Sequence, residues 1–489
     1  MKLAAGLLGV LLMVMNAHAK DVVITVDDLP VAGKKLELYV RTGDFQTAAA
    51  LTPGFNRTWH DVDFTKAKVG NEAIDGPMTI TIGSDGWNPK EPLTLGLQVI
   101  ADLKAGTVVV KQNDKALNAA LKELQTPDSG RVTFDCQNLL SLDKPGKTHW
   151  ATLAMAVTKA KVELPRIEPH GSLTDTSFAV LIDGYSLVTQ RRGIGGSMNT
   201  KIRPQGGEIK EADLALQSFA IGPRLFGTIT QREGGKDAGS GRVVGIIEAP
   251  VSPDNAIITL TLHDAVGPGG YLKLHLATKD RRVVSAFGTT PNFNNATHTV
   301  DASAIKIDGD TITGAVSVTV NPDPWQPKDG KAIRGTINVN ARAVQGEWSG
   351  GFSFDTRVRD GIVNGTTDVK TEAKPTSITL KLENALVGGN EWSNRVFMSF
   401  QVDGEKITGG KISNNHTKLA GTVDGGTVKI TDTNFAAMPA ITVTAGGKAT
   451  SYTFDVQGVV VGKWAAGTFT TFVDGKKAKT GTFWAGLAK

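Results

Sequence analysis

The sequence predicts an all-β protein built from tandem antiparallel β-sandwich modules, arranged as a two-module unit that occurs twice. Short runs of residues alternate between apolar and polar with a period of two, and Asp-Gly, Asn-Gly and Gly-Gly turns separate them. Glycine is abundant, at 56 of 489 residues, and aromatic residues make up only 6%, which suits sheets with many tight turns. Alternation of this kind leaves one face of a sheet buried and the other wet, as in antiparallel sandwiches.

The third observation is an internal repeat. Residues 53–90 align with residues 291–328 without a gap and at a constant offset. The motifs Pro-x-Phe-Asn, His-x-Val-Asp and Trp-x-Pro-Lys occur at the same relative positions in both segments. Chance does not place Trp, His and Pro in step over such a length, so the sequence indicates a duplication.

Further matches extend the duplication to the rest of the chain. Residues 133–140 resemble 379–386, and residues 227–241 resemble 467–481. The start of each module also carries a similar alternating strand, so each half contains two modules the size of one β-sandwich. The predicted segments are a signal peptide at 1–19 and sandwich modules at 20–131, 132–253, 254–375 and 376–489.

One segment departs from the β pattern. Asn113 or Asp114 could cap a helix, and Pro127 would follow its end. Three leucines lie at helical spacing: Leu117, Leu121 and Leu124. These features predict one short helix near 113–124, between the first and second modules.

The N-terminal residues predict export. A positive start is followed by an apolar run and by Ala17-His18-Ala19, the pattern of a secretory signal peptide cleaved after Ala19. We therefore expect a bacterial-type protein of the periplasm, the cell surface or the extracellular space. No later stretch reaches the roughly 18 apolar residues of a transmembrane helix, so no membrane span is expected.

Charge and cysteine content limit the possible partners and cross-links. The 53 basic and 48 acidic residues are spread along the chain, without the Lys and Arg clusters of a nucleic-acid surface. Nucleic acid is therefore not an expected partner. Cys136 is the single cysteine, and its apolar surroundings predict a buried thiol rather than a reactive one.

A histidine recurs in every module. Asp63 and Asp301 accompany the first and third of these residues, and the second and fourth lack the carboxylate. A metal site needs three or four convergent ligands, so a role in the fold is favoured over metal binding, and no metal or other cofactor is predicted. The four histidines are His60, His170, His298 and His416.

The repeated Trp-x-Pro-Lys motif is the candidate ligand-binding site. Trp87 with Lys90, and Trp325 with Lys328, could form twin flat platforms on which sugar rings stack. The alternative is a tryptophan that packs on the proline and closes one end of a sandwich. Two further tryptophans lie in alternating strands and are expected in the core: Trp348 and Trp464.

Catalytic motifs are hard to find. The chain has no Gly-x-Ser-x-Gly elbow, no His-Glu-x-x-His and no phosphate-binding loop, so no catalytic residue is predicted.

Three functions follow from these features. The first is a non-catalytic structural or adhesive scaffold of the envelope or exterior, with self-association or other envelope components as partners. The second is a carbohydrate-binding protein whose twin tryptophan sites hold polysaccharide. The third is a hydrolase or lyase acting on a polysaccharide, which requires His60, Asp63 and Trp87 to converge in one cleft. Any function carried by the repeat should occur on both the first and third modules.

Overall fold

The structure is a computed structural model and describes residues 19–489 with internal gaps. The described part omits 30–33, 44, 54–57, 84–91, 140–148, 160, 170–177, 191–192, 205–207, 267–269, 292, 324–325, 356, 371–373, 384, 388–394, 415–419 and 446–447. The chain divides into two compact units. The first comprises Met1–Val162, Ile182–Thr200 and Glu211–Glu248, and the second comprises Glu163–Leu181, Lys201–Lys210 and Ala249–Lys489.

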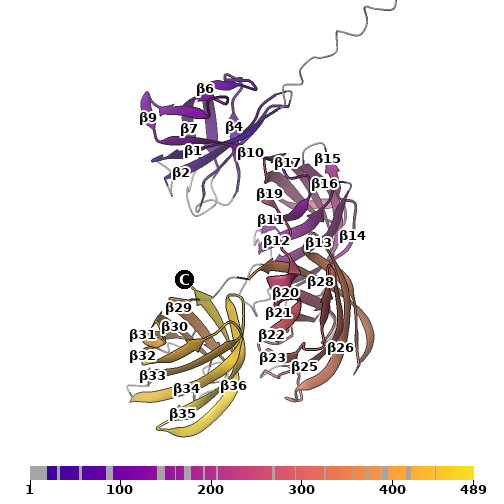
Figure 1. Cartoon of the computed structure of the whole chain (residues 1–489), viewed down its shortest axis with the longest axis vertical. Helices are drawn as coiled ribbons and strands as arrows, with labels where there is room; N and C mark the ends of the chain where they lie inside the picture. Colours follow the sequence, from indigo (N-terminus) through magenta and orange to yellow (C-terminus); the bar gives the residue numbers. More distant parts are fainter. Residues whose placement is uncertain are drawn as a thin grey trace, which may run out of the picture. The chain divides into compact units, whose positions relative to one another are not determined.

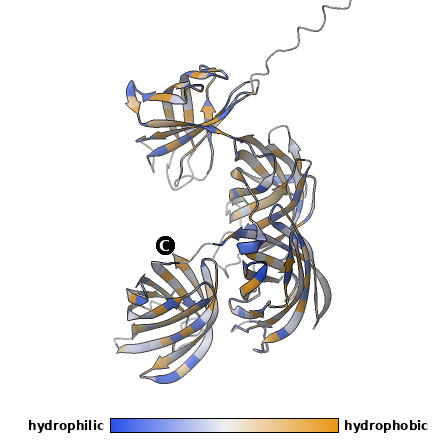
Figure 2. Cartoon of the chain, viewed as in Figure 1, coloured by the Kyte–Doolittle hydropathy of each residue, from blue (hydrophilic) through white to orange (hydrophobic). Residues whose placement is uncertain are grey.

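The all-β prediction is confirmed. The described residues form strands throughout, and their one helical element is the single 3-10 turn η1 (Pro253–Asn255). No helix in this part of the chain is long and apolar enough to cross a membrane. Hydrophobic and hydrophilic residues alternate along the strands (Figure 2), because successive side chains point to opposite faces of a sheet.

The first sheet has the order β10-β1-β2-β3-β4-β6-β7-β8-β9, with β5 paired to β6 (Figure 1). Its strands are β1 (Asp21–Asp27), β2 (Lys35–Arg41), β3 (Thr47–Leu51), β4 (His60–Asp63), β5 (Lys68–Val69), β6 (Ala73–Ile82), β7 (Leu93–Asp102), β8 (Thr107–Gln112), β9 (Lys115–Leu117) and β10 (Ala119–Leu124).

The second sheet has the order β13-β12-β11-β19-β18-β17-β16-β14, with β15 paired to β16. Its strands are β11 (Gly130–Leu139), β12 (His149–Val157), β13 (Val162–Pro169), β14 (Phe178–Tyr185), β15 (Val188–Gln190), β16 (Gly193–Pro204), β17 (Lys210–Ile221), β18 (Arg224–Glu233) and β19 (Lys236–Glu248).

The third sheet has the order β23-β22-β21-β20-β28-β27-β26-β25-β24, and an additional pairing between β23 and β25 closes the circuit. Its strands are β20 (Ala256–His263), β21 (Tyr271–Lys279), β22 (Arg282–Thr289), β23 (Thr297–Asp301), β24 (Lys306–Asp308), β25 (Thr311–Val320), β26 (Ile333–Val344), β27 (Glu347–Phe354) and β28 (Arg357–Val369).

The fourth sheet is a closed antiparallel barrel of consecutive strands (Figure 1). Apolar side chains fill its interior, among them Leu380, Phe400 and Phe454, which are all at most 1% exposed. Its strands are β29 (Ser377–Leu382), β30 (Val396–Asp403), β31 (Lys406–Ser413), β32 (Ala420–Ile430), β33 (Asn434–Ala445), β34 (Lys448–Val461), β35 (Trp464–Val473) and β36 (Lys476–Ala488).

In every sheet the first strand pairs with the last. β1 pairs with β10, β11 with β19, β20 with β28 and β29 with β36, all antiparallel. Each module is therefore one continuous sheet curled on itself, where the sequence had suggested two facing sheets. The reason is that long strands in a staggered register curl around a single core, and barrel closure depends on that stagger.

The predicted helix near 113–124 is wrong. Asn113 and Asp114 have φ values of 48° and 62° and form the two-residue turn of a hairpin that leads from β8 into β9. Such a turn needs positive φ at both central positions, which Asn and Asp tolerate. Leu117 and Leu121 pack against the core of the first sheet as strand residues of β9 and β10.

Candidate functional site

The histidine that both halves share is buried in the first and third modules. His60 and His298, at corresponding positions of β4 and β23, are 1% and 3% exposed. Each has its Nε2 beside a buried threonine hydroxyl, at 3.1 Å from Thr52 and 2.7 Å from Thr290. The repeated histidine therefore belongs to the fold in the first and third modules. His170 and His416 lie outside the described residues.

A shared glycine has the same kind of role. Gly76 and Gly314 have φ values of 141° and 131°, which side-chain-bearing residues rarely adopt. A Cβ on Gly76 would lie 2.7 Å from Ala67 Cα, and one on Gly314 would lie 2.4 Å from the Ala304 carbonyl oxygen. Both halves thus keep a glycine because the preceding turn passes too close for a side chain.

His298 holds a loop in place. The Asn321 backbone N–H donates to His298 Nδ1 over 3.1 Å, so Nδ1 must be the unprotonated nitrogen. Nε2 then carries the hydrogen and donates to Thr290 Oγ1, which in turn donates to Asn294 Oδ1. Burial lowers the pKa of His298 to about 3, so this neutral form persists at ordinary pH.

The same loop is fixed at further points. Asn294 Nδ2 donates to the carbonyl oxygens of Asn321 and Gln326 at 2.7 Å and 3.2 Å. Asp323 accepts the Gln326 N–H through Oδ1 at 2.7 Å and the Asn295 N–H through Oδ2 at 3.0 Å. We call this segment the 321–330 loop; partly buried hydrogen bonds hold residues 321, 323 and 326.

The histidine and aspartate of the His-x-Val-Asp motif do not converge. His60 points into the protein, whereas the exposed Asp63 accepts the N–H and hydroxyl of Thr65. His298 is likewise buried, and the exposed Asp301 accepts the Ser303 N–H. The two residues lie on opposite faces of a strand, so they do not supply one cleft with an imidazole and a carboxylate.

In the first unit, a buried ion pair joins the first sheet to the second. Arg41 donates to both carboxylate oxygens of Asp21, at 2.6 Å and 2.5 Å, and both side chains are less than 10% exposed. Asp21 also accepts the Gly222 N–H at 2.8 Å and the Thr126 hydroxyl at 2.7 Å. Burial alone would raise the pKa of Asp21, but these hydrogen bonds bring it below its usual value.

A second set of contacts closes the same interface. The Arg242 guanidinium lies 4.3 Å from the centre of the Trp59 ring, and its Nη2 is 2.6 Å from Asp61 Oδ2. Trp59 Nε1 donates to the Gly227 carbonyl at 2.9 Å. The indole also packs at right angles to the Phe219 ring, 5.8 Å away. A tryptophan and an arginine thus fill the space between β4 and the β18–β19 hairpin.

The second unit uses equivalent strands but different chemistry. Ile257 and Ala277 are paired on β20 and β21 as Asp21 and Arg41 are on β1 and β2. They belong to an apolar cluster that joins the third sheet to the barrel, and its other members are Phe287, Val459, Val461, Trp464 and Ala466. An ion pair in one half is therefore replaced by aliphatic contact in the other.

The two tryptophans expected in the core have different positions. Trp348 is 1% exposed in the core of the third sheet, as predicted, and its Nε1 donates to Thr367 Oγ1 at 2.7 Å. Trp464 is outside the barrel core, contrary to the prediction. It lies on the outer barrel face, edge-on to Trp484 at 5.6 Å, and packs toward the third sheet.

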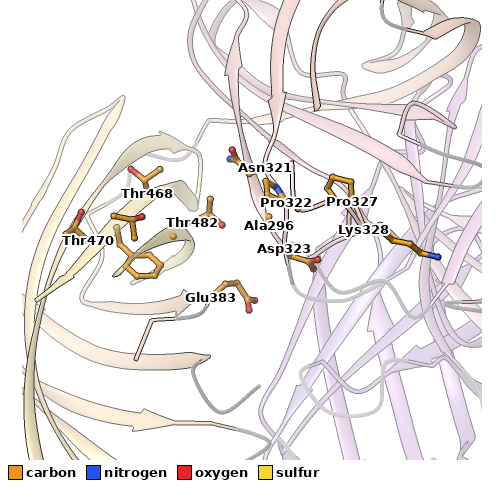
Figure 3. Close-up of a pocket in the computed structure, with 14 residues that line it drawn as sticks. Ala296, Asn321, Pro322, Asp323, Pro327, Lys328, Glu383, Thr468, Thr470 and Thr482 are labelled. Carbon is orange, nitrogen blue, oxygen red and sulfur yellow. The ribbon is translucent and has the colours of Figure 1, made fainter. Parts of the chain in front are cut away.

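Next to this apolar cluster the second unit has a groove of about 740 Å³. One wall is the outer face of β35 and β36, and the other is the 321–330 loop with Ala296 (Figure 3). Four threonines lie on the barrel wall in two directly opposed cross-strand pairs, Thr468 with Thr482 and Thr470 with Thr480. The barrel wall of the groove therefore presents four hydroxyl groups.

The charged residues of the groove are paired or anchored. Glu383, at one end, is 2.9 Å from Lys381 Nζ and accepts Arg395 Nε at 2.7 Å. Asp323 on the opposite wall accepts backbone N–H groups of the loop. Lys328 is exposed, and in Figure 3 its side chain extends away from the threonines.

Lys328 is the one predicted ligand-binding residue that the structure describes, and it lines this groove. Trp87, Lys90 and Trp325 lie outside the described residues, so the twin platforms remain a prediction.

A further charged cluster in the second unit has a structural role. Arg166 donates to Glu347 at 2.5 Å and lies 2.6 Å from Glu168, and Glu347 is fully buried. Lys273 is 3.8 Å from Glu168. The two acids and two bases balance each other. Among the described residues, no group of three His, Cys, Asp or Glu side chains is arranged to hold a metal ion.

Cys136 is a buried free thiol, as predicted. Burial raises its pKa to about 12, so it remains protonated.

Comparison with known proteins finds no matching family model and no curated relative. Among solved structures, the chain is similar to intact transferrin-binding protein B (Ap-TbpB, N and C lobes), at 14% identity over 72% of this chain and 77% of that one, with a TM-score of 0.18. It is also similar to a mutant of the vaccine antigen transferrin-binding protein B from Haemophilus parasuis Hp5, at 9% identity over 95% of both chains, with a TM-score of 0.16. At these TM-scores the likeness supports no inference about fold or function.

Proposed function

We propose that this chain is an exported, non-catalytic repeat protein that serves as a structural or adhesive scaffold of the bacterial envelope or exterior. The observation that carries the proposal is the burial of one polar pair, a histidine and a threonine, that the two halves share. Thr52 with His60, and Thr290 with His298, are bonded to each other inside their modules. The duplication has preserved the framework, which suits a protein selected for its shape and contacts.

The joints between modules also support this proposal. In the first unit, the buried Asp21 accepts the Gly222 N–H of the second sheet, and partly buried contacts join Trp59 to Arg242 and Gly227. In the second unit, Thr297 donates to the Phe483 carbonyl at 2.9 Å beside the apolar cluster. Paired modules with such interfaces behave as stiff elements, since motion of one module would break buried contacts. Stiffness is useful in a spacer or an assembly unit.

The test is a fractionation experiment with the full chain expressed behind its own N-terminal segment. We expect the protein to appear in envelope or surface fractions, and the purified chain to self-associate in sedimentation velocity between about 1 and 100 µM. A chain found only in the cytoplasm, or one that is released from all envelope fractions and stays monomeric over that range, would contradict the proposal.

A further inference from the structure

We infer that the groove of the second unit is a binding site for a neutral oligosaccharide. This goes beyond the scaffold proposal and does not depend on it, because a scaffold needs no groove. The groove lies between the outer face of β35 and β36 and the 321–330 loop (Figure 3). Its volume of about 740 Å³ falls within the range of small-ligand sites and can hold a few sugar rings.

The barrel wall has the chemistry that sugars require. Thr468 and Thr482 are directly opposed, and Glu383 follows in the same row because its N–H donates to the Thr482 carbonyl. Thr470 and Thr480 form the next row. A threonine hydroxyl both donates and accepts, so four of them can match sugar hydroxyls that do the same. A carboxylate adds an acceptor at one end of the groove.

An extended peptide fits the groove less well. Peptides that add to a sheet need an unpaired strand edge. Here β35 is paired on both sides, with β34 and β36, and β36 is paired with β35 and β29. The barrel wall therefore offers side chains and no free backbone edge.

A strongly charged polymer also fits less well. Glu383 is balanced by Lys381 and Arg395, and the other wall carries one acid and one base, Asp323 and Lys328. The groove thus presents charges of both signs, and neither a polyanion nor a polycation would meet a complementary field. A neutral, hydroxyl-rich ligand matches this wall best.

The opposite wall is ordered before any ligand arrives. The backbone N–H of Asn321 is bound to neutral His298, and Asn294 holds the carbonyls of Asn321 and Gln326. A wall held by several internal hydrogen bonds loses little conformational entropy on binding, which favours affinity.

In the first half, a large side chain occupies the position that corresponds to Thr482. Arg242 corresponds to Thr482 and Asp61 to Thr299 in the aligned repeats. In the first unit, the Arg242 side chain stacks on Trp59 and pairs with Asp61. In the second unit the smaller Thr482 lines the groove and Thr299 is exposed, so the two halves have diverged at both positions.

This divergence supplies the test variant. In the double substitution Thr482→Arg with Thr299→Asp, the arginine should fill the groove, and the aspartate supplies the carboxylate that Asp61 gives Arg242 in the first half. Thr427→Arg is the matched control, since Thr427 is exposed on β32, across the barrel from β36. Both variants use the full chain, and circular dichroism with a thermal melt checks that each is folded.

The experiment measures retention of each protein on immobilised four-unit oligomers of glucose, mannose, galactose and N-acetylglucosamine, with oligomers of uronic acids and a hexapeptide library alongside. We expect at least one neutral oligomer to retain the wild type and the Thr427→Arg control equally. The groove-filled variant should bind that oligomer about tenfold or more weakly.

Three outcomes would overturn the inference. These are no retention on any neutral oligomer, equal retention of the groove-filled variant, and retention only on uronic acids or peptides. If the groove-filled variant fails to fold, Thr470→Arg alone on the same wall replaces it, with the same expected loss. Failure here would leave envelope location and self-association, the tests of the scaffold proposal, unaffected.

Discussion

The buried pair of Asp21 and Arg41 predicts a large and specific loss of stability in the first unit. Asp21→Asn keeps the shape of the side chain but removes its charge, which leaves the Arg41 guanidinium buried without a counter-charge. It also places an amide among the donors of Arg41, Gly222 and Thr126. Breaking one partner of a buried ion pair costs about 3–5 kcal/mol, and both side chains are less than 10% exposed here.

The second half suggests a double variant that avoids the unpaired buried charge. Ile257 and Ala277 occupy the equivalent paired positions without any charge. The double substitution Asp21→Ile with Arg41→Ala should therefore cost much less than Asp21→Asn. Some loss remains, because the Gly222 N–H loses its acceptor, which costs about 1–3 kcal/mol.

Hydrogen exchange followed by mass spectrometry is the suitable assay, since a chain of several modules does not unfold as one two-state unit. The free energy of opening is measured for peptides that cover β1 and β2. Glu72→Gln is the control: Glu72 pairs with Lys104 at 3.4 Å, but both side chains are at least 75% exposed, and we expect no measurable change.

The pH dependence of stability gives a second test of the Asp21–Arg41 pair. Because the pKa of Asp21 is lowered in the folded chain, the pair contributes fully above the usual carboxylate pKa of 3.8 and is lost as pH falls through the lowered value. The reasoning is refuted if Asp21→Asn and the Ile/Ala double variant are destabilised equally, or if neither changes exchange in β1 and β2.

Three further predictions concern the second unit and the thiol. Burial lowers the pKa of His275 and His298 to about 3, so the unfolded chain binds more protons below about pH 6.5. Calorimetry should therefore show the second unit losing stability from that pH downward, and a melting temperature unchanged between pH 6.5 and 4 would contradict this. Glu347→Ala should lower the free energy of unfolding in urea by about 3 kcal/mol or more, because the buried Arg166 loses one of its carboxylate partners. The double substitution Arg166→Met with Glu347→Leu removes both charges and should be close to neutral. Equal losses of stability in the two variants would argue against a stabilising role for the ion pair. Cys136 should resist iodoacetamide at pH 8 in the folded chain and react once urea unfolds it, since its thiol is buried with a pKa of about 12; rapid labelling of the folded chain would show that the site opens.

The strands and the duplication were predictable because both depend on local pattern. Period-two alternation marks a strand wherever one face is buried, and repeated motifs such as His60 and His298 survive because they are fixed inside the fold. The helix error has a local cause. Leu117, Leu121 and Leu124 fit a helical spacing, but Asn113 and Asp114 adopt positive φ and turn the chain into a hairpin.

Other features depend on distances that a sequence pattern does not contain. Alternation places Trp464 on one face of its strand, but it does not tell an inner face from an outer face that a neighbouring module covers. Barrel closure likewise depends on stagger between strands. The groove is lined by Thr482 where the first half has the larger Arg242, and the sequence signal for it was this difference between the aligned halves.

The pairing of first and last strands gives each module neighbouring entry and exit points. β1 pairs with β10, and β29 pairs with β36, so the chain leaves a module beside the place where it entered. A whole module can then be copied in tandem with only a short connection and without rethreading any existing sheet. The same arrangement means that no module can complete its sheet until its final strand is available. Each module should therefore finish folding in turn, as a separate event along the chain.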